Sequence, residues 1–176
     1  QIAALYGSYY FWGLKDPYSA TNNTQKSGPV GAWNSGTNYA PVKNQTYDPC
    51  PSGFRVPTTN EWLKLIEYTT SENIGKWDAT PVDFGGSFGA GKVLRSKKNT
   101  SVKITLPIAG TFHAAAHVDY RGYVGNYWTS TESSNVQLIR FSVENPVPAT
   151  SAVVTSISTT DKSFNQYSLR CIADVP

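Results

Sequence analysis

Methionine is absent from the sequence, and cysteine and histidine occur only twice each among 176 residues. A chain that starts at Gln1 without methionine is expected to be a mature product or an excised domain of a longer protein. No apolar run approaches the roughly 18 residues that would indicate a membrane-spanning helix. The sequence therefore predicts no membrane span in this chain.

Charge is also scarce, since Asp, Glu, Lys and Arg make up 15% of the residues and the net charge is +3. The basic residues are spread along the chain, apart from one cluster in "RSKKNTSVK", residues 95–103. Nucleic-acid-binding domains usually gather their basic residues in a patch or stripe. We interpret the cluster as a solvated turn and expect no nucleic-acid partner.

Aromatic residues, in contrast, are abundant, with eleven Tyr, seven Phe and five Trp. With a hydrophobic content of 39%, they are sufficient for the core of a single domain over residues 1–176. Tyr and Trp are also favoured at recognition surfaces, because each ring combines apolar area with a polar tip.

One helix has a clear start signal. Thr58 and Glu61 form a capping box, in which each side chain satisfies a backbone N–H group of the first turn. The residues that follow at helical spacing form one stripe: Trp62, Leu65, Ile66 and Thr69. We predict a helix over about residues 59–70 and a second, short helix in "GAGKVLRS", residues 89–96.

The rest of the chain is predicted to form strands and long loops, the loops at residues 14–46 and 71–92. "YVGNYWTST" and "NVQLIRFSV" predict a hairpin, with a bulge near Ile139. In "YSLRCIADV", residues 167–175, every second residue is expected to lie on one face. Strands and helices do not alternate, which argues against a parallel sheet. The predicted class is α+β with mostly antiparallel strands.

Three motifs resemble catalytic or phosphate-binding sequences. "GGSFG" would make Ser87 a nucleophile, but no Asp or Glu lies between it and the next histidine, so the required order of acid and histidine fails. "GSFGAGKV" has Val93 where a phosphate-binding loop needs Ser or Thr. "HAAAH" has Ala114 where a zinc protease needs Glu, although Asp119 offers a third ligand. We expect neither an enzyme nor a metal site.

The two cysteines are far apart in the sequence. Cys50 precedes the predicted helix, and Cys171 lies on the last predicted strand. A disulfide would close a long loop, whereas two separate buried thiols would suit a reducing compartment. The residues alone leave both interpretations open.

"YDPCPSGFRVPTTNEW", residues 47–62, resembles the "DPCPxGxRVPTxxEW" signature of the Fibrobacter major paralogous (FISUMP) domain family. "LPIAG", "GNYWTST" and "YSLRCI" resemble later blocks of that family in the same order, and "YYFWGLKDPY" resembles its N-terminal element. The resemblance covers most of the chain. It implies part of an exported bacterial surface or fimbrial-tip protein with a C-type-lectin-like fold.

In such folds the N- and C-terminal strands pair, and a disulfide joins the start of the helix to the last strand. The resemblance therefore implies a Cys50–Cys171 bond. Formylglycine-generating enzymes share the fold and need reactive cysteines, which this bond would remove. Calcium-dependent lectins carry "EPN" or "QPD" before "WND", and the scrambled "ENPVP" at residues 144–148 does not match. We expect no cofactor, and calcium stays an open alternative whose lectin motifs are absent.

The function implied by the resemblance is non-enzymatic, adhesin-like recognition of a glycan or a host protein outside the cell. A receptor-binding protein of a phage tail fibre or cell surface, diversified by a retroelement, is the first alternative, with "ATSAVVTSISTTD" at residues 149–161 as its compositional hint. A formylglycine-generating-type enzyme is the second alternative.

Aromatic and amide-rich segments late in the chain are the predicted ligand-binding residues, because Tyr and Trp stack on ligands and amides hydrogen-bond adaptably. The predicted residues are Tyr120, Tyr123, Asn126, Trp128, Ser133, Ser134, Asn135, Asn165, Gln166 and Tyr167. Trp128 has a second interpretation as a core residue, because one of two adjacent strand residues points inward.

Overall fold

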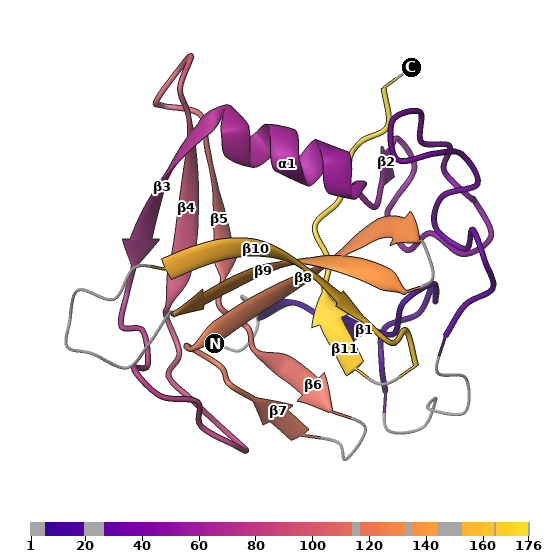
Figure 1. The fold of residues 1–176 in the computed structure, drawn as a ribbon. Helices are drawn as coiled ribbons and strands as arrows, with labels where there is room; N and C mark the ends of the chain where they lie inside the picture. Colours follow the sequence, from indigo (N-terminus) through magenta and orange to yellow (C-terminus); the bar gives the residue numbers. More distant parts are fainter. Residues whose placement is uncertain are drawn as a thin grey trace.

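The structure is a computed structural model that describes residues 6–19, 27–113, 117–132, 135–143, 153–163 and 165–175, with the backbone alone for residues 139–143, 153 and 154. Strands dominate these ranges, and one α-helix crosses one end of the sheets (Figure 1). No described helix is long and apolar enough to span a membrane.

The elements have the following bounds in chain order: β1 Tyr9–Tyr10, β2 Phe54–Arg55, α1 Thr59–Glu67, β3 Thr69–Ile74, β4 Gly91–Ser96, β5 Lys103–Pro107, β6 Thr111–His113, β7 His117–Asp119, β8 Val124–Glu132, β9 Val136–Val143, β10 Val153–Thr160, β11 Asn165–Ser168 and β12 Ile172–Ala173.

Seven strands form the largest sheet, in the order β10-β9-β8-β11-β6-β7, with β1 paired to β11. Its pairings are antiparallel except for one parallel contact, in which Ser168 of β11 lies opposite Tyr127 of β8. The strands β3, β4 and β5 form a separate antiparallel sheet, and β12 pairs with β2. The predicted mainly antiparallel architecture with one helix is confirmed, and so is the pairing of strands from the two ends of the chain.

The predicted start of α1 is confirmed, but its end is earlier than predicted. The backbone N–H of Glu61 donates to Thr58 Oγ1 at 3.3 Å, and the Thr58 N–H donates to Glu61 Oε2 at 2.8 Å. The helix ends at Glu67, and Thr69 and Thr70 already belong to β3. These two β-branched residues pair with β4, and that long-range contact outweighs the helical spacing of Thr69.

The second predicted helix is wrong, because residues 91–96 form the central strand β4 of the three-stranded sheet. Its first four residues are buried on both faces, so the two-residue period of a strand is hidden in the sequence. Lys92 is part of this buried run and donates from Nζ to Asn73 Oδ1 at 3.0 Å. The predicted loop at residues 71–92 is likewise shorter, since β3 extends to Ile74.

The predicted β8–β9 hairpin is confirmed, but the predicted bulge near Ile139 is wrong. The register is regular from the Val124–Ser142 pair to the Trp128–Leu138 pair, and it shifts between Trp128 and Glu132. The last predicted strand also breaks, because β11 ends at Ser168 and β12 begins at Ile172. The alternate residues from Tyr167 to Val175 therefore do not lie on one face of a continuous strand.

The Cys50–Cys171 disulfide is confirmed, with Cα atoms 5.8 Å apart and a sequence separation of 121. Asp48 orders the turn that carries Cys50, because its carboxylate accepts the N–H groups of Cys50 and Val56 at 2.8 and 2.9 Å. Burial raises the pKa of Asp48, and these two hydrogen bonds oppose the rise. The bond thus ties an ordered turn before α1 to the chain just before β12.

Strand β8 separates two hydrophobic cores, because adjacent strand residues point to opposite faces. Trp128 packs with Trp12 and Trp33 in the first core, and Tyr127 packs with Trp62 in the second. Both β8 residues are almost completely buried. The Trp128 indole N–H donates to the carbonyl of Tyr10 at 2.7 Å, so the first core also fixes the N-terminal strand.

Candidate functional site

Two adjoining hollows of about 360 and 410 Å³ lie where β8 ends, and both are bordered by Val30 and Glu132. We call the two together the polar cleft. Three segments that are far apart in the sequence form its walls. The lining residues are Ser27, Val30, Gly31, Asn34, Ser35, Gly36, Thr37, Asn38, Ser130, Thr131, Glu132, Asn135, Val136, Asp161, Lys162 and Ser163.

Glu132 joins the three walls of the polar cleft. One carboxylate oxygen accepts the backbone N–H of Gly31 at 2.9 Å, and the other accepts Lys162 Nζ at 3.0 Å. The Glu132 side chain is 14% exposed, so the ion pair with Lys162 is shielded from bulk water on most sides. The carboxylate therefore holds the loops against the end of β8.

Hydrogen bonds within the loop of residues 34–43 fix the first wall. Asn34 Oδ1 accepts the N–H groups of Gly36 and Val42, both at 2.9 Å, and the Thr37 N–H donates to the carbonyl of Ala40 at 3.0 Å. The tip of the loop exposes Tyr39, which is 81% accessible. An ordered loop thus exposes the aromatic ring of Tyr39, which is next in sequence to Asn38 of the cleft lining.

The floor of the polar cleft is attached to the start of α1. Thr131 Oγ1 donates to Asn38 Oδ1 at 2.8 Å and accepts the N–H of Thr59 at 2.9 Å. Asn38 Oδ1 also accepts the N–H of Asn60 at 3.1 Å. Ser130 beside them is 3% exposed, and its hydroxyl has no hydrogen-bond partner among the described residues.

The third wall carries charges of both signs. Asp161 accepts the N–H and hydroxyl of Ser163 at 2.7 and 2.6 Å, and these bonds lower the pKa of its exposed carboxyl. Lys162 lies 5.5 Å from the centre of the Trp12 ring, in addition to its ion pair with Glu132. An ionised carboxylate and an ammonium group are thus held side by side at the rim.

Tyr120 and Tyr123 lie in a separate region, in the turn between β7 and β8. Tyr120 has a left-handed backbone with φ of 60°, and its carbonyl accepts the N–H of Tyr123 at 3.0 Å. Burial and the neighbouring carboxylates of Asp83 and Asp119 raise the pKa of Tyr120. Both rings are partly exposed, so this turn forms a second surface with aromatic character.

The two histidines meet at this second surface, on opposite strands of the β6–β7 hairpin. His113 and His117 place their Nε2 atoms 3.4 and 3.0 Å from the same oxygen of Asp119, and the other oxygen accepts the N–H of Phe84 at 2.7 Å. Within the described ranges, no group of three or more His, Cys, Asp or Glu residues has an arrangement that would hold a metal ion.

The ten sequence-predicted ligand residues do not form one surface. Asn126, Trp128, Gln166 and Tyr167 are buried, with Gln166 and Trp128 at 0% exposure. Tyr120, Tyr123 and Asn165 are half-buried, and Asn135 is exposed in the polar cleft. Ser133 and Ser134 lie outside the described residues, as do residues 144–152 with all of "ENPVP".

The catalytic motifs are part of ordinary structural elements. The Ser87 hydroxyl and N–H both donate to the carboxylate of Asp78, so this serine stabilises a loop. The Lys92 of "GSFGAGKV" lies within β4, and β4 is not followed by a helix. Cys50 and Cys171 are joined, which leaves no free cysteine in the chain.

Most of the polar cleft was missed by reasoning from the sequence. Only Asn135 among its lining residues belongs to the predicted set. The signal for the wall at residues 27–38 was the length of the loop at residues 14–46, since loops of that length usually have a function.

A family model, the Fibrobacter succinogenes major domain, matches residues 2–173. The chain belongs to this family. The Fibrobacter major domain is typical of bacterial surface proteins. The Cys50–Cys171 disulfide of this chain is consistent with an exported protein. No curated protein and no solved structure matches the chain. The resemblance seen in the sequence motifs is therefore confirmed at the level of the family.

Proposed function

We propose that this Fibrobacter major domain is a non-enzymatic recognition domain of an exported bacterial surface protein, and that it binds a glycan in the polar cleft. The observation that carries the proposal is the ordered combination of donors and acceptors around Glu132, Asp161 and Lys162. The loop that forms the first wall also exposes Tyr39, next in sequence to the lining residue Asn38.

Sugars have the properties that this surface would recognise. Each hydroxyl group is both a donor and an acceptor, so a site with carboxylate, amide and ammonium groups satisfies both roles. The C–H face of a sugar ring is apolar and packs on an aromatic ring. Because the loop bonds already order the walls, little conformational entropy would be lost on binding.

A C-type-lectin-like fold, which is part of this proposal, would support the same function. The pairing of β1 with β11 and the bond from Cys50 to Cys171 are the two features expected of that fold. We propose that the recognition is metal-free, because an ammonium group and hydrogen-bonded carboxylates, rather than a set of convergent oxygen ligands, surround the cleft.

The test is binding of the purified domain to a glycan array with and without EDTA, followed by titration of the best sugar. Tyr39→Ala should weaken that binding by about 3- to 10-fold, the range expected for one aromatic stacking contact. Tyr68→Ala is the matched control, since Tyr68 is also exposed, at 64%, but follows α1 and is not next in sequence to any residue of the cleft lining. Unchanged affinity of Tyr39→Ala would contradict the assignment to the polar cleft.

Tyr120 and Tyr123 remain proposed as an alternative contact surface for the same function. Their alanine variants form the second arm of the titration. A loss of binding in Tyr120→Ala or Tyr123→Ala, with Tyr39→Ala unaffected, would move the site to the turn between β7 and β8. Loss of binding in EDTA would contradict the metal-free proposal.

A further inference from the structure

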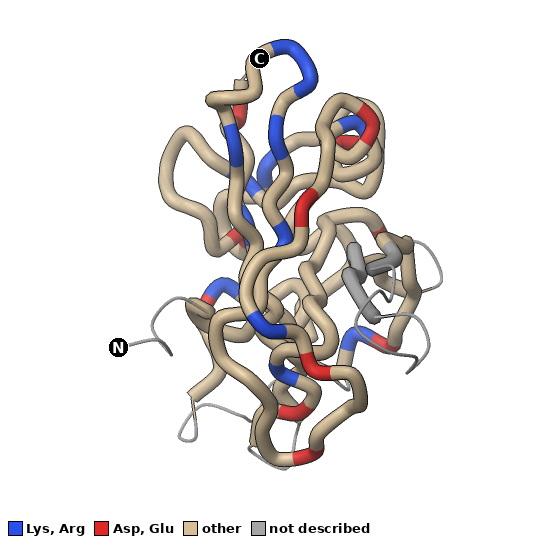
Figure 2. Tube along the Cα trace, turned by 90° about the vertical axis from the view of Figure 1, so that its left-hand side faces the viewer, with Lys and Arg blue, Asp and Glu red and all other residues tan. Residues whose placement is uncertain are grey.

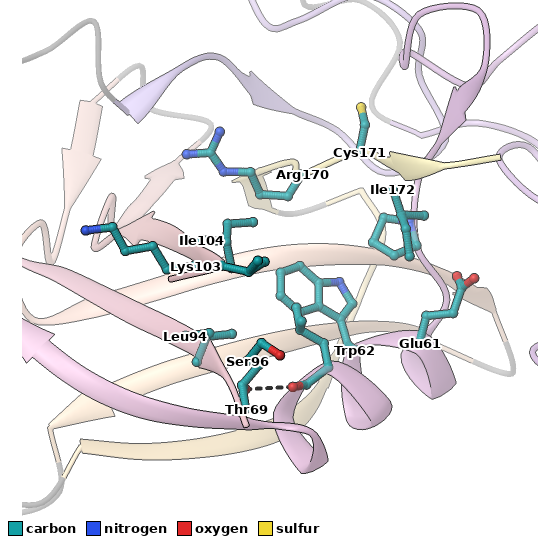
Figure 3. Close-up of a pocket in the computed structure, with 13 residues that line it drawn as sticks. Glu61, Trp62, Thr69, Leu94, Ser96, Lys103, Ile104, Arg170, Cys171 and Ile172 are labelled. Carbon is teal, nitrogen blue, oxygen red and sulfur yellow. Dashed lines mark hydrogen bonds between the residues drawn. The ribbon is translucent and has the colours of Figure 1, made fainter. Parts of the chain in front are cut away.

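An apolar pocket of about 300 Å³ lies between α1, the β4–β5 hairpin and the chain before β12 (Figure 3). Its walls include Trp62 and Leu65 of α1, Leu94 of β4, Ile104 of β5 and Ile172 of β12. It shares no lining residue with the polar cleft. Its size is at the lower end of the range of small-molecule sites, which are mostly apolar with a few polar groups.

Two basic side chains, Lys103 and Arg170, border this pocket. Lys103 and Arg170 extend to the same side of the view in Figure 3, away from Glu61 and Ile172. Neither forms an ion pair with another described residue. Arg170 is half-buried, and its Nε has no hydrogen-bond partner in the described part of the chain. A partly buried cation without a partner is costly, so a bound anion at this end would stabilise it.

The Glu61 carboxylate and the Ser96 hydroxyl of the lining already accept hydrogen bonds, and the Thr69 hydroxyl donates to the carbonyl of Leu65 at 2.6 Å. Both oxygens of Glu61 accept hydrogen bonds from Arg55, at 2.7 and 2.5 Å. Ser96 Oγ accepts two backbone N–H groups of the β4–β5 turn, both at 3.2 Å. The charged side chains that remain are the cations Lys103 and Arg170, at the edge of apolar walls. Such a lining matches a ligand with an apolar body and an anionic head.

The surroundings add positive potential. The β4–β5 hairpin carries Lys97, Lys98 and Lys103, and Figure 2 shows basic positions at this projecting end of the molecule. Arg95 of the same hairpin is neutralised by an ion pair with Glu72 at 3.2 Å. A gathering of like charge attracts ligands of the opposite sign and raises their association rate.

We propose that the apolar pocket binds a small organic carboxylate, with its aliphatic or aromatic body against Trp62, Leu94 and Ile104 and its carboxylate at the end bordered by Lys103 and Arg170. The pocket is thus a second ligand site of the domain. Its occupancy does not depend on glycan binding in the polar cleft.

The test uses three ligands with the same alkyl chain: octanoate, octan-1-ol and octylammonium. Each is titrated at neutral pH into ¹⁵N-labelled protein, and the indole N–H signal of Trp62 and the amide signals of Ile104 and Ile172 are followed. Octanoate should bind about tenfold more tightly than octan-1-ol, and octylammonium should bind more weakly than either. Equal affinity for the three ligands, or no shift with octanoate up to about 10 mM, would overturn the proposal.

Lys103→Gln should weaken octanoate binding by about 3- to 10-fold and leave octan-1-ol binding unchanged. Lys98→Gln is the matched control, because it removes the same charge from the adjacent turn but does not line the pocket. Equal effects of the two variants would show that the positive electrostatic potential of the whole hairpin, and not the pocket, selects the anion. Tyr39→Ala should leave octanoate binding unchanged, so the failure of one site is distinguishable from the failure of the other.

Discussion

Removal of the Cys50–Cys171 disulfide is predicted to cost up to about 5 kcal/mol of the unfolding free energy. The bond joins positions 121 residues apart. In the chain-entropy model, a loop of about that length restricts the unfolded chain by roughly 16 cal/mol/K, which is about 5 kcal/mol at room temperature. This figure is an upper value, because residual structure in the unfolded chain reduces it.

Cys171→Ala is the cleaner variant, because it leaves the Cys50 side chain in the first core. Urea unfolding followed by tryptophan fluorescence measures the loss, and the thermal midpoint should fall by about 10–20 °C. The double variant Cys50→Ala/Cys171→Ala should lose about 1 kcal/mol more, because it also removes a buried sulfur. A loss below about 1 kcal/mol in Cys171→Ala would refute the entropic reasoning.

Two further predictions concern buried polar contacts. Burial alone would raise the pKa of Glu61, but its hydrogen bonds from Arg55 and Thr58 outweigh burial and lower the pKa below the ordinary value of 4.5. A carboxyl whose pKa is lowered by folding stabilises the folded state above its unfolded-state pKa, and this stabilisation is lost as the pH falls. Glu61→Gln should therefore reduce the free energy of unfolding by about 1–3 kcal/mol at neutral pH. In urea titrations the reduction should become progressively smaller below pH 4.5. Trp128→Phe should reduce the free energy of unfolding by about 2–3 kcal/mol in the same assay. The smaller ring leaves a space in the first core, and the Tyr10 carbonyl loses its hydrogen-bond donor. A reduction below about 0.5 kcal/mol would contradict the role of Trp128 in the core.

The parts of the fold that were predictable from the sequence depend on local interactions. The capping box of Thr58 and Glu61 lies within four residues, and it correctly located the start of α1. The end of α1 depends instead on the pairing of Thr69 with Ser96, which no local pattern encodes. In β4, burial on both faces removed the alternation that identifies a strand, and its sequence was compatible with a helix.

The disulfide depended on a different kind of information. The residues alone left two interpretations of Cys50 and Cys171 open, and the resemblance to the Fibrobacter major domain implied the bond that the structure contains. The candidate site was the least predictable part. The polar cleft is assembled from residues 130–136, where β8 ends and β9 begins, and from loop residues 27–38 and 161–163. The two loop segments carry no periodicity that would indicate their proximity to the strands.

The two proposed ligand sites lie on either side of the start of α1, and this position decides which variants are informative. Thr59 and Asn60 donate to the floor of the polar cleft, whereas Glu61 and Trp62 line the apolar pocket. A substitution at the start of α1 would disturb both sites together, and a loss of binding there would not show which site a ligand occupies. Tyr39 and Lys103 are both exposed, and the two sites that they probe share no lining residue, so their effects should be independent. If Tyr39→Ala alters only glycan binding and Lys103→Gln alters only octanoate binding, the double variant should show both losses unchanged. Coupling between them would mean that α1 transmits a change from one site to the other.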